Sequence, residues 1–527
     1  MKRRAVLQAA VSGAAALAAS GIVRAQSRTI LTFVPQADLA NLDPIWSTSD
    51  VSRNHGHAVF DSLYGVDAQF AAKPQMVAGA TTSADGKQWN LTLRDGLRFH
   101  DGTPVLGRDV VASLTRWGKR DSFGGVVFAA TDELSAPTDK TVRFRLSKPF
   151  GLLPDALATA ANMAAIMPAR LAKTDPYQQV TEMVGSGPFR FVADERVSGS
   201  RVVYEKFAGY VPRPDGVPSY TSGPKIAHVD RVVWTVVLDP ATAAATLGTG
   251  EFDWWENPGI DLVPQLNRNR AITVVVKDTT GEMGCMRFNQ LYPPFDNLAI
   301  RQVVLSAVNQ QDVMDAVAGA DPSLIKVPNG VFANDTPMAS DAGLAVLKGS
   351  ADPAALRRAL AAAGYKGERI VVLAASDFPT INAMAEVAGD LLKRIGFNVD
   401  YQSLDWGTVV QRRASREPPD KGGWNIFFTF LGGTNNLSPA SHLALRSNGL
   451  KAWFGWPDLP KTEALRLSWF DAPDLSAQQQ VARAIQAQAM LDVPYAPMGM
   501  YYQPTAFRKT ISGIPDGFPQ FYGVKKG

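Results

Sequence analysis

Cysteine and histidine are scarce in this chain. Its 527 residues include one cysteine, Cys285, and five histidines. A single cysteine excludes an internal disulfide framework and provides no metal cluster of the paired-cysteine type. We therefore expect neither a cofactor nor a bound metal ion.

The sequence also lacks the common signatures of hydrolases. It contains no His-Glu-x-x-His pair, no Gly-x-Ser-x-Gly elbow and no recognisable cysteine-histidine arrangement. Ser186 stands between two glycines, where a turn serine is a better interpretation than a nucleophile. We predict that the protein is not an enzyme. An exported hydrolase is the alternative from another class, and a structural or chaperone-like envelope protein is a third.

Runs of one charge are missing as well. The first 25 residues hold four of the 53 Lys and Arg residues and none of the 49 acids, so 49 residues of each sign follow them. A nucleic-acid partner needs a basic field, and a formally neutral chain provides none. We therefore expect no nucleic-acid partner. Hydrophobic residues make up 46% of the chain, as in a globular protein.

Residues 1–25 are typical of an export signal. A basic start that includes Arg3 and Arg4 precedes a short Ala-rich run, and Ala25 completes a small-residue cleavage pattern. The paired arginines resemble a twin-arginine signal, which predicts a periplasmic protein. A general secretory signal and a retained membrane anchor are the alternatives.

Residues 88–117 carry the clearest local pattern in the rest of the chain. Alternating apolar residues around Trp89 and again around Phe99 predict two strands, each followed by an Asp-Gly turn. Apolar residues at helical spacing then predict a helix that reaches Trp117. His100, beside the second turn, is interpreted as a structural histidine.

This segment resembles the signature of the family 5 extracellular solute-binding proteins, the peptide, dipeptide and nickel receptors of ABC importers. Later segments resemble the family as well, including the turns Gly185–Phe189 and Gly250–Asp253 and the run Met286–Asn297. In residues 88–117 the match is carried by Trp89, Leu93, Arg94, Gly96, Phe99, His100, Asp101, Gly102, Pro104, Asp109 and Val110.

The resemblance implies an α/β fold with two lobes joined by crossing strands around a ligand cleft. This is the type II periplasmic binding protein fold, in its large variant with an extra subdomain. The implied lobe I comprises residues 26–49, 185–273 and 497–527. Residues 50–184 form its supporting subdomain, and residues 274–496 form lobe II.

Several later elements are predicted from the residues themselves. Apolar patterns predict helices over 152–165 and 300–317. Asp352 is a suitable N-cap for a helix that starts at Pro353. The strand at 370–374, the helix at 382–395 and the strand at 397–404 predict a parallel pair with a right-handed crossover.

The resemblance also indicates where the ligand binds. Trp406 follows an acid at the end of a predicted strand. It matches the position of a cleft tryptophan in peptide-binding relatives and is the strongest single candidate. Tyr501 lies where the chain returns to lobe I. The full set of candidate ligand-binding residues is Thr48, Ser49, Asp50, Trp255, Glu256, Asn257, Trp406, Phe430, Gly432, Gly433, Thr434, Asn435 and Tyr501.

The loop Gly432–Asn436 departs from the peptide receptors, which generally carry an aspartate there for the amino terminus of the peptide. This loop has no acid. A buried ammonium needs a paired carboxylate, so a peptide with a free amino terminus requires Asp50, Glu256 or Asp405 in that role. A polar, uncharged loop also suits hydroxyl or amide groups, which keeps a sugar-like or metal-complex ligand as the alternative.

His55 and His57 are the one histidine pair with a spacing that invites a metal interpretation. On an extended segment both would face one side, whereas on a helix they diverge around the axis. Because no partner cluster of Cys or His accompanies them, we favour a structural role.

The resemblance implies a receptor that closes over a small solute, with a peptide or peptide-like compound as the first candidate. The receptor would deliver this ligand to the permease subunits of an ABC transporter in the inner membrane. We expect a monomer.

Overall fold

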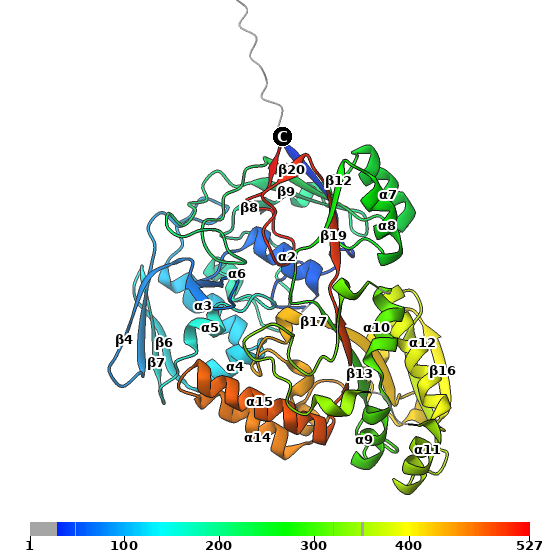
Figure 1. Ribbon diagram of the computed structural model, residues 1–527. Helices are drawn as coiled ribbons and strands as arrows, with labels where there is room; N and C mark the ends of the chain where they lie inside the picture. The colour runs from blue at the N-terminus through cyan, green and yellow to red at the C-terminus, as the bar shows by residue number, and fades with distance from the viewer. Residues whose placement is uncertain (1–28, 48, 320, 349–351) are drawn as a thin grey trace, which may run out of the picture.

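The computed structural model describes residues 29–47, 49–319, 321–348 and 352–527. The predicted export signal and Thr48 lie outside these residues. Figure 1 shows two lobes, one above the other, with a further layer at the side of the upper lobe. Among the described helices, none is both long and apolar enough to cross a membrane.

Lobe I, the upper body in Figure 1, is built on a seven-stranded sheet. The first strand pairs in parallel with two neighbours that lie about 200 residues later in the chain, so distant segments form one core. Helix α7, Pro240–Thr249, is capped by the Asp239 side chain. In sheet order the strands are β12 Ile272–Val276, β19 Pro504–Arg508, β11 Trp254–Trp255, β1 Ile30–Val34, β10 Arg231–Thr235, β9 Arg201–Lys206 and β8 Phe189–Phe191.

Lobe II is built on a six-stranded mixed sheet flanked by helices. Its strands in order are β14 Ile325–Lys326, β18 Ala496–Tyr501, β13 Glu282–Phe288, β17 Ile426–Gly432, β15 Arg369–Ala375 and β16 Asn398–Leu404. Its helices are α9 Leu298–Ala307, α10 Gln310–Ala318, α11 Pro353–Ala362, α12 Pro379–Arg394, α13 Trp406–Arg412, α14 Pro460–Ser468 and α15 Leu475–Asp492.

A supporting subdomain lies beside lobe I. Its antiparallel sheet has the order β4 Val77–Thr82, β5 Gln88–Leu93, β7 Thr141–Leu146 and β6 Thr131–Thr138. Helices α3 Gly107–Gly118, α4 Ser122–Ala129 and α5 Leu153–Leu157 accompany it. The buried ion pair between Arg116 of α3 and Asp43 of lobe I, with Nη2 and Oδ2 2.6 Å apart, helps to fix the subdomain to that lobe.

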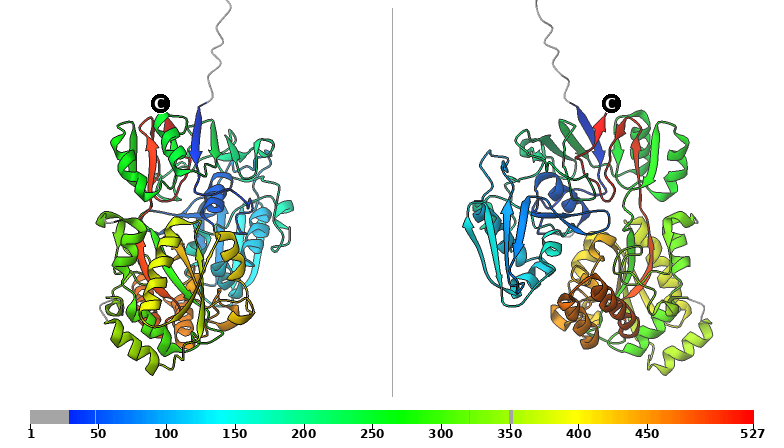
Figure 2. Two further views of the ribbon diagram at one scale, coloured as in Figure 1. Left: turned by 90° about the vertical axis from the view of Figure 1, so that its right-hand side faces the viewer. Right: turned by 60° about the vertical axis from the view of Figure 1, so that its left-hand side comes forward.

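Two short segments carry the chain between the lobes. Residues 277–281 join β12 of lobe I to β13 of lobe II, and residues 502–503 join β18 back to β19. Figure 2 shows these crossings at one side of the waist between the lobes. The predicted two-lobe α/β fold is confirmed. The predicted domain boundaries stay a prediction.

Helix α2, Asp50–Val59, lies at the centre of the molecule between these parts. All of its residues from Val51 to Val59 are buried. Val51, Ala58 and Val59 pack with strands of lobe I in one apolar cluster. The helix therefore belongs to the core of lobe I by packing, although its position in the sequence adjoins the supporting subdomain.

The predicted parallel unit of lobe II is confirmed. Strands β15 and β16 pair in parallel over their whole length, from Arg369 with Asn398 to Ala375 with Leu404, and α12 connects them. The predicted cap is confirmed too, because the Asp352 carboxylate accepts hydrogen bonds from the amides of Ala354 and Ala355.

Three predicted elements are wrong in extent. The strand around Phe99 is only one isolated bridge, between Arg98 and Pro104. The helix over 152–165 stops at Leu157. Buried backbone groups after it form hydrogen bonds outside a helix; for example, the carbonyl of Asn162 accepts from the Trp117 indole. The helix over 300–317 is two helices, because Asn309 caps the second one by accepting from the amide of residue 311.

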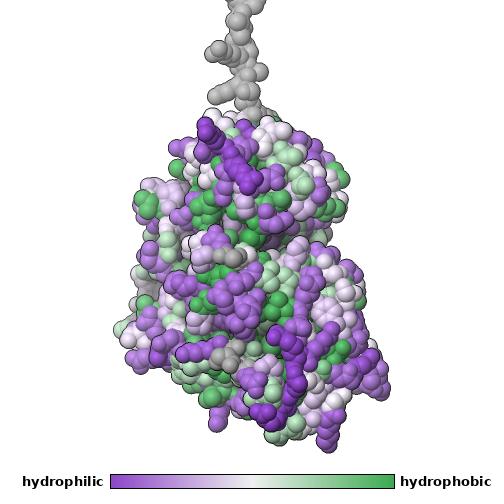
Figure 3. All heavy atoms as spheres, turned by 45° about the vertical axis from the view of Figure 1, so that its right-hand side comes forward, coloured by the Kyte–Doolittle hydropathy of each residue, from purple (hydrophilic) through white to green (hydrophobic). Residues whose placement is uncertain are grey.

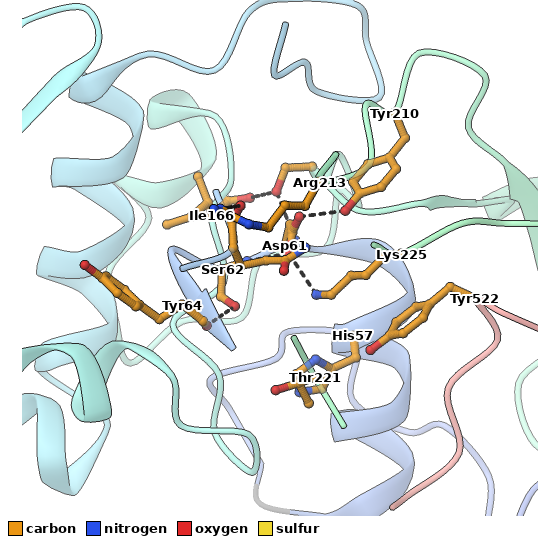
Figure 4. A network of polar contacts seen from close by, with 12 residues as sticks. His57, Asp61, Ser62, Tyr64, Ile166, Tyr210, Arg213, Thr221, Lys225 and Tyr522 are labelled. Atoms are coloured by element: carbon orange, nitrogen blue, oxygen red, sulfur yellow. Dashed lines mark hydrogen bonds and ion pairs between the residues drawn. The ribbon is translucent and has the colours of Figure 1, made fainter. Parts of the chain in front are cut away.

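A buried polar network fixes the end of α2 to lobe I (Figure 4). Asp61 accepts from Tyr210 Oη at 2.8 Å and pairs with Lys225. The Asp61 amide donates to Ser186 Oγ at 3.0 Å, and Ser186 Oγ donates to the carbonyl of Ile166 at 2.8 Å. Both interactions of the serine hydroxyl are with backbone groups, which is the arrangement of a structural turn serine.

Candidate ligand-binding cleft

A cavity of about 60 Å³ lies where the two lobes meet. Lobe I lines it with the first turn of α2, with Trp254, Glu256 and Asn257, and with residues 517–519. The crossing segments and the start of β13 supply Lys277, Asp278, Glu282 and Gln503. This volume holds only a few water molecules.

Four carboxylates line this cavity around Arg53. Asp50 comes from the first turn of α2, Glu256 from the end of β11, and Asp278 and Glu282 flank the first crossing. Arg53 Nη1 is 2.9 Å from Asp50 Oδ1, and its guanidinium lies 4.2 Å from the ring centre of Phe518. Lys277, the second cation of the lining, pairs with Asp516 outside it.

The pKa values in the cleft follow from burial and from this crowding. Burial raises the pKa of Glu256 to about 7, although the amides of Gln36 and Asn54 donate to its two oxygens at 2.7 Å each. Burial and the charges of Asp50 and Asp278 raise the pKa of Glu282 well above its usual range. The cleft therefore holds several acids whose negative charge a cation would stabilise.

Arg53 connects the two lobes directly. Burial acts against its charge, but Asp50 and the other nearby acids raise its pKa. Its Nη1 donates to Thr434 Oγ1 of lobe II at 3.4 Å. Thr434 is placed there because residue 433 is a glycine: a Cβ at that position would lie 2.0 Å from the carbonyl oxygen of Thr280.

The sheet of lobe II continues the cleft on its own side. Glu282 pairs with Gly432 on one neighbouring strand and with Tyr501 on the other. The rings of Tyr501 and Phe430 meet edge to face with centroids 5.1 Å apart. Tyr501 is buried, and burial with the nearby charge of Glu282 raises its pKa.

The structure thus brings many of the candidate residues to one place. Asp50, Glu256 and Asn257 line the cavity. Thr434 is connected to the cavity by its hydrogen bond with Arg53. Gly432 and Tyr501 pair with Glu282 on the two neighbouring strands, and Phe430 packs against Tyr501. Gly433 N donates to the carbonyl of Gly281 at the first crossing, and half-buried Asn435 follows in the same turn.

Four candidates lie elsewhere or are not described. Ser49 precedes α2 and its hydroxyl donates to Ser52, away from the cavity lining. Trp255 packs in the core of lobe I against Leu247 and Ala506, whereas its neighbour Trp254 lines the cavity. Thr48 is outside the described residues.

Trp406 lies at the start of α13, separate from the cavity lining. Its indole is half-buried, with Phe378 at 6.1 Å between ring centres and the Arg413 guanidinium at 5.4 Å. The preceding acid, Asp405, caps α13 by accepting from the Thr408 amide and hydroxyl. Asp405 is therefore engaged locally, which leaves Asp50 and Glu256 as the acids from the sequence analysis that line the cavity.

The two histidines of α2 diverge, as expected for a helix. His55 Nδ1 bonds to Tyr204 Oη at 2.9 Å, and His57 Nε2 bonds to the carbonyl of Ala160 at 2.9 Å. Burial lowers the pKa of each to about 3. In the part of the chain that the structure describes, no group of three or more His, Cys, Asp or Glu side chains is arranged to hold a metal ion.

Comparison with known proteins identifies the family. The profile described as "Bacterial extracellular solute-binding proteins, family 5 Middle" matches residues 71–449. The chain is 35% identical over its full length to a protein from Sinorhizobium fredii, covering 99% of it. That relative is named "Probable peptide ABC transporter periplasmic-binding protein y4tO".

This chain belongs to the family 5 extracellular solute-binding proteins. The resemblance predicted from the sequence is confirmed, and the protein is a solute-binding protein. Solved structures agree on the fold. A dipeptide-binding protein from Pseudoalteromonas in complex with Met-Leu has a TM-score of 0.77 at 20% identity, covering 94% of this chain and 100% of that one.

A second solved structure shows the breadth of ligands on this fold. It is the periplasmic binding protein AgaA of A. tumefaciens in complex with agropinic acid, with a TM-score of 0.76 at 21% identity. It covers 94% of this chain and 99% of that one. The fold alone therefore does not identify the ligand.

Sequence reasoning missed Arg53, Asp278 and Glu282. Arg53 stands one helical turn after Asp50, an ion-pair spacing that the sequence contains. Asp278 and Glu282 lie on either side of Gly281 at the predicted crossing between the lobes. Because the cleft lies between the lobes that this segment joins, acids in the segment lie near the cleft. These two signals were present without the structure.

Proposed function

We propose that this protein is the periplasmic receptor of an ABC importer and that it captures peptides or peptide-like solutes that present a positive charge. The observation that carries the ligand class is the cleft in which four carboxylates surround one engaged arginine. The name of the S. fredii relative and the Met-Leu complex support the peptide class.

The loop acid of peptide receptors is absent here, and the cleft supplies other acids. Glu256, buried in lobe I, and Glu282, at the start of β13, come from opposite sides of the crossing. An ammonium between them would donate charge-assisted hydrogen bonds to carboxylates of both lobes. Binding would lower the pKa of each acid and so favour the ionised pair.

Ligand capture then works by closure. The lobes are joined by residues 277–281 and 502–503, which are short enough to act as a hinge. A ligand that contacts Glu256 on one side and Glu282 on the other binds the closed form more tightly than the open one. This difference in affinity drives closure, and the permease subunits recognise the closed shape.

Residues 1–25 support the route to the periplasm. Their basic start, apolar run and small-residue end suit an exported precursor, and the arginine pair suits the twin-arginine route. We propose a monomer, because a receptor must present the tips of both lobes to its permease.

Calorimetry with matched ligands tests the ligand class. We expect heat with a tripeptide that has a free amino terminus and at least tenfold weaker binding of the same tripeptide after N-acetylation, which removes the charge. A Glu282→Gln variant should weaken binding of the free peptide and leave the acetylated one unchanged. Equal affinity for the two peptides would contradict a cationic subsite.

A sugar-like ligand is the second candidate, favoured by the uncharged loop Gly432–Asn436 at the mouth of lobe II. Native mass spectrometry of freshly purified protein distinguishes the two classes by the mass of a retained ligand. No heat with di- to pentapeptides, together with heat from a sugar, would replace the peptide proposal.

A further inference from the structure

The supporting subdomain contacts lobe II at a place remote from the crossing segments. Helix α4 of the subdomain faces the turn Trp469–Asp471 between α14 and α15 of lobe II (Figure 1). The Phe123 ring lies 5.7 Å from Phe470 and 6.4 Å from Trp469, between centroids. Ser122 Oγ donates to the carbonyl of Ala440 at 3.0 Å.

The aromatic side chains of this contact are buried. Phe123 is 4% exposed, Trp469 3% and Phe470 6%. By contrast, the nearby ion pair between Lys148 and Asp471 is exposed, with side chains 54% and 63% accessible. The apolar rings therefore dominate the free energy of this contact, since exposed ion pairs contribute little.

Local structure holds Phe123 in position. The Asp121 carboxylate caps α4 by accepting from the Gly124 amide at 2.7 Å. Gly124 permits close packing of α4 on α3, since a Cβ there would lie 2.9 Å from Gly118 Cα and from the Trp117 ring. The phenylalanine is presented to lobe II by a rigid helix pair rather than by a loop.

Buried polar contacts attach the subdomain to lobe I, so we expect the two to move together when the lobes open. The buried Arg116–Asp43 ion pair and the hydrogen bond of His100 Nε2 with the carbonyl of Gly187, at 3.1 Å, connect it to lobe I. Opening the lobes about the crossings separates α4 from the turn Trp469–Asp471. It exposes the three aromatic side chains to water.

We propose that Phe123, Trp469 and Phe470 form an interlobe latch that stabilises the closed form without contacting the ligand. None of the three lines the cleft cavity. The latch sets the ratio of closed to open protein before any solute binds, and that ratio scales the affinity for every ligand by the same factor.

Single-molecule Förster resonance energy transfer, measured without ligand, tests the latch. Dyes are placed at Val217→Cys in lobe I and Leu491→Cys in lobe II, two exposed positions. Cys285 is buried, and burial raises the pKa of its thiol to about 12, so it reacts poorly with the dyes. Because no solute is used, failure of this experiment is separate from failure of the proposed function.

Phe123→Ala should lower the ratio of closed to open molecules by about tenfold or more, the effect of removing one buried aromatic side chain from the closed state. Phe123→Leu keeps the space filled and should give a smaller shift in the same direction. Lys148→Ala is the matched control on the same surface, and its distance distribution should equal that of the parent.

Two outcomes would overturn the latch. One is that the parent protein, without ligand, already shows the same long interlobe distance as Phe123→Ala. The other is an unchanged distance distribution in both Phe123 variants. If Phe123→Ala unfolds the subdomain, the Phe123→Leu and Phe470→Leu variants decide, and their shifts should be less than additive in the double variant because the two rings share one contact.

Discussion

Lys225 Nζ lies 2.8 Å from Asp61 Oδ1, and neither side chain has any exposed surface. Burial acts against the charge of Asp61, but Lys225 and the hydroxyl of Tyr210 outweigh it and lower the pKa of the carboxyl. The pair connects the end of α2 to a loop 164 residues later in the chain. Figure 4 shows that Tyr522, near the C-terminus, also faces the ammonium.

Replacing Asp61 by Asn should lower the free energy of unfolding by about 3–5 kcal/mol, because it leaves the Lys225 ammonium buried without a counter-charge. Urea unfolding measures this loss. Arg394→Gln is the matched control: its ion pair with Asp390 is exposed on α12, so the expected change is within about 0.5 kcal/mol. Equal losses in the two variants would show that burial of the Lys225 pair has no special cost.

His442 should make the protein sensitive to acid. Burial lowers its pKa to about 3 in the folded state, while the unfolded value is about 6.5. Between these values the unfolded chain binds a proton that the folded one does not, so this group destabilises the fold increasingly as the pH falls through that window. A His442→Gln variant should be less stable than the parent at pH 8, since it changes the hydrogen bond to the carbonyl of Val331.

The stability gap between parent and His442→Gln should shrink by about 1.4 kcal/mol per pH unit below pH 6. Thermal or urea unfolding at several pH values measures this gap. A gap that stays constant from pH 8 to pH 4 would mean that His442 takes up a proton in the folded protein as readily as in the unfolded chain.

Ligand affinity should depend on pH through Glu256. Its pKa is raised to about 7 in the cleft, and a cationic ligand binds the ionised form. Affinity for a free-amino tripeptide should therefore fall by up to about tenfold per pH unit below pH 7. Glu256→Gln should bind more weakly at pH 8 and show a flatter profile, and a profile as steep as that of the parent would assign the titration to another acid.

Ser186→Ala should cost stability and change no chemical activity. The variant loses the hydroxyl that bridges the Asp61 amide and the carbonyl of Ile166, at an expected cost of about 1–3 kcal/mol. Parent and variant should show the same background with chromogenic ester and peptide substrates. Turnover that disappears in the variant would restore the hydrolase interpretation.

His100→Ala should lower the melting temperature and leave affinity unchanged in the folded protein. Both ring nitrogens are used within the fold, one with the carbonyl of Gly187 and one with the amide of Gly185. The cost should be about 1–3 kcal/mol, since two buried backbone groups lose their partner. Abolished binding at unchanged melting would contradict a purely structural role.

The sequence predicted the parts of the fold whose signals are local. Asp352 and Pro353 mark the start of α11, and the alternation over 397–404 marks β16, because caps and periodicity act within a few residues. The helix break at Asn309 was missed although the cap residue was visible. Continuous apolar spacing on both sides of Asn309 masked it, and packing decided in favour of two helices.

The site was predictable only in part, for a geometric reason. Asp50 and Glu256 were named as candidates through the family resemblance, but their place in one cavity with Glu282 depends on how two lobes meet across a crossing. The choice between Trp254 and Trp255 is a matter of strand phase: adjacent residues face opposite sides of the sheet, and the sequence pattern of β11 is too short to set that phase.

Helix α2 has a consequence for altering this receptor. Its residues from Val51 to Val59 are buried. Val51, Ala58 and Val59 pack in the core of lobe I, and His55 and His57 bond to Tyr204 and to the carbonyl of Ala160. Asp50, Arg53 and Asn54 are the members that reach the cleft or its acids. Substitutions on α2 that alter ligand preference, whether designed or natural, are therefore confined to those three positions. A library restricted to them covers nearly all of the variation that this helix can contribute to ligand binding.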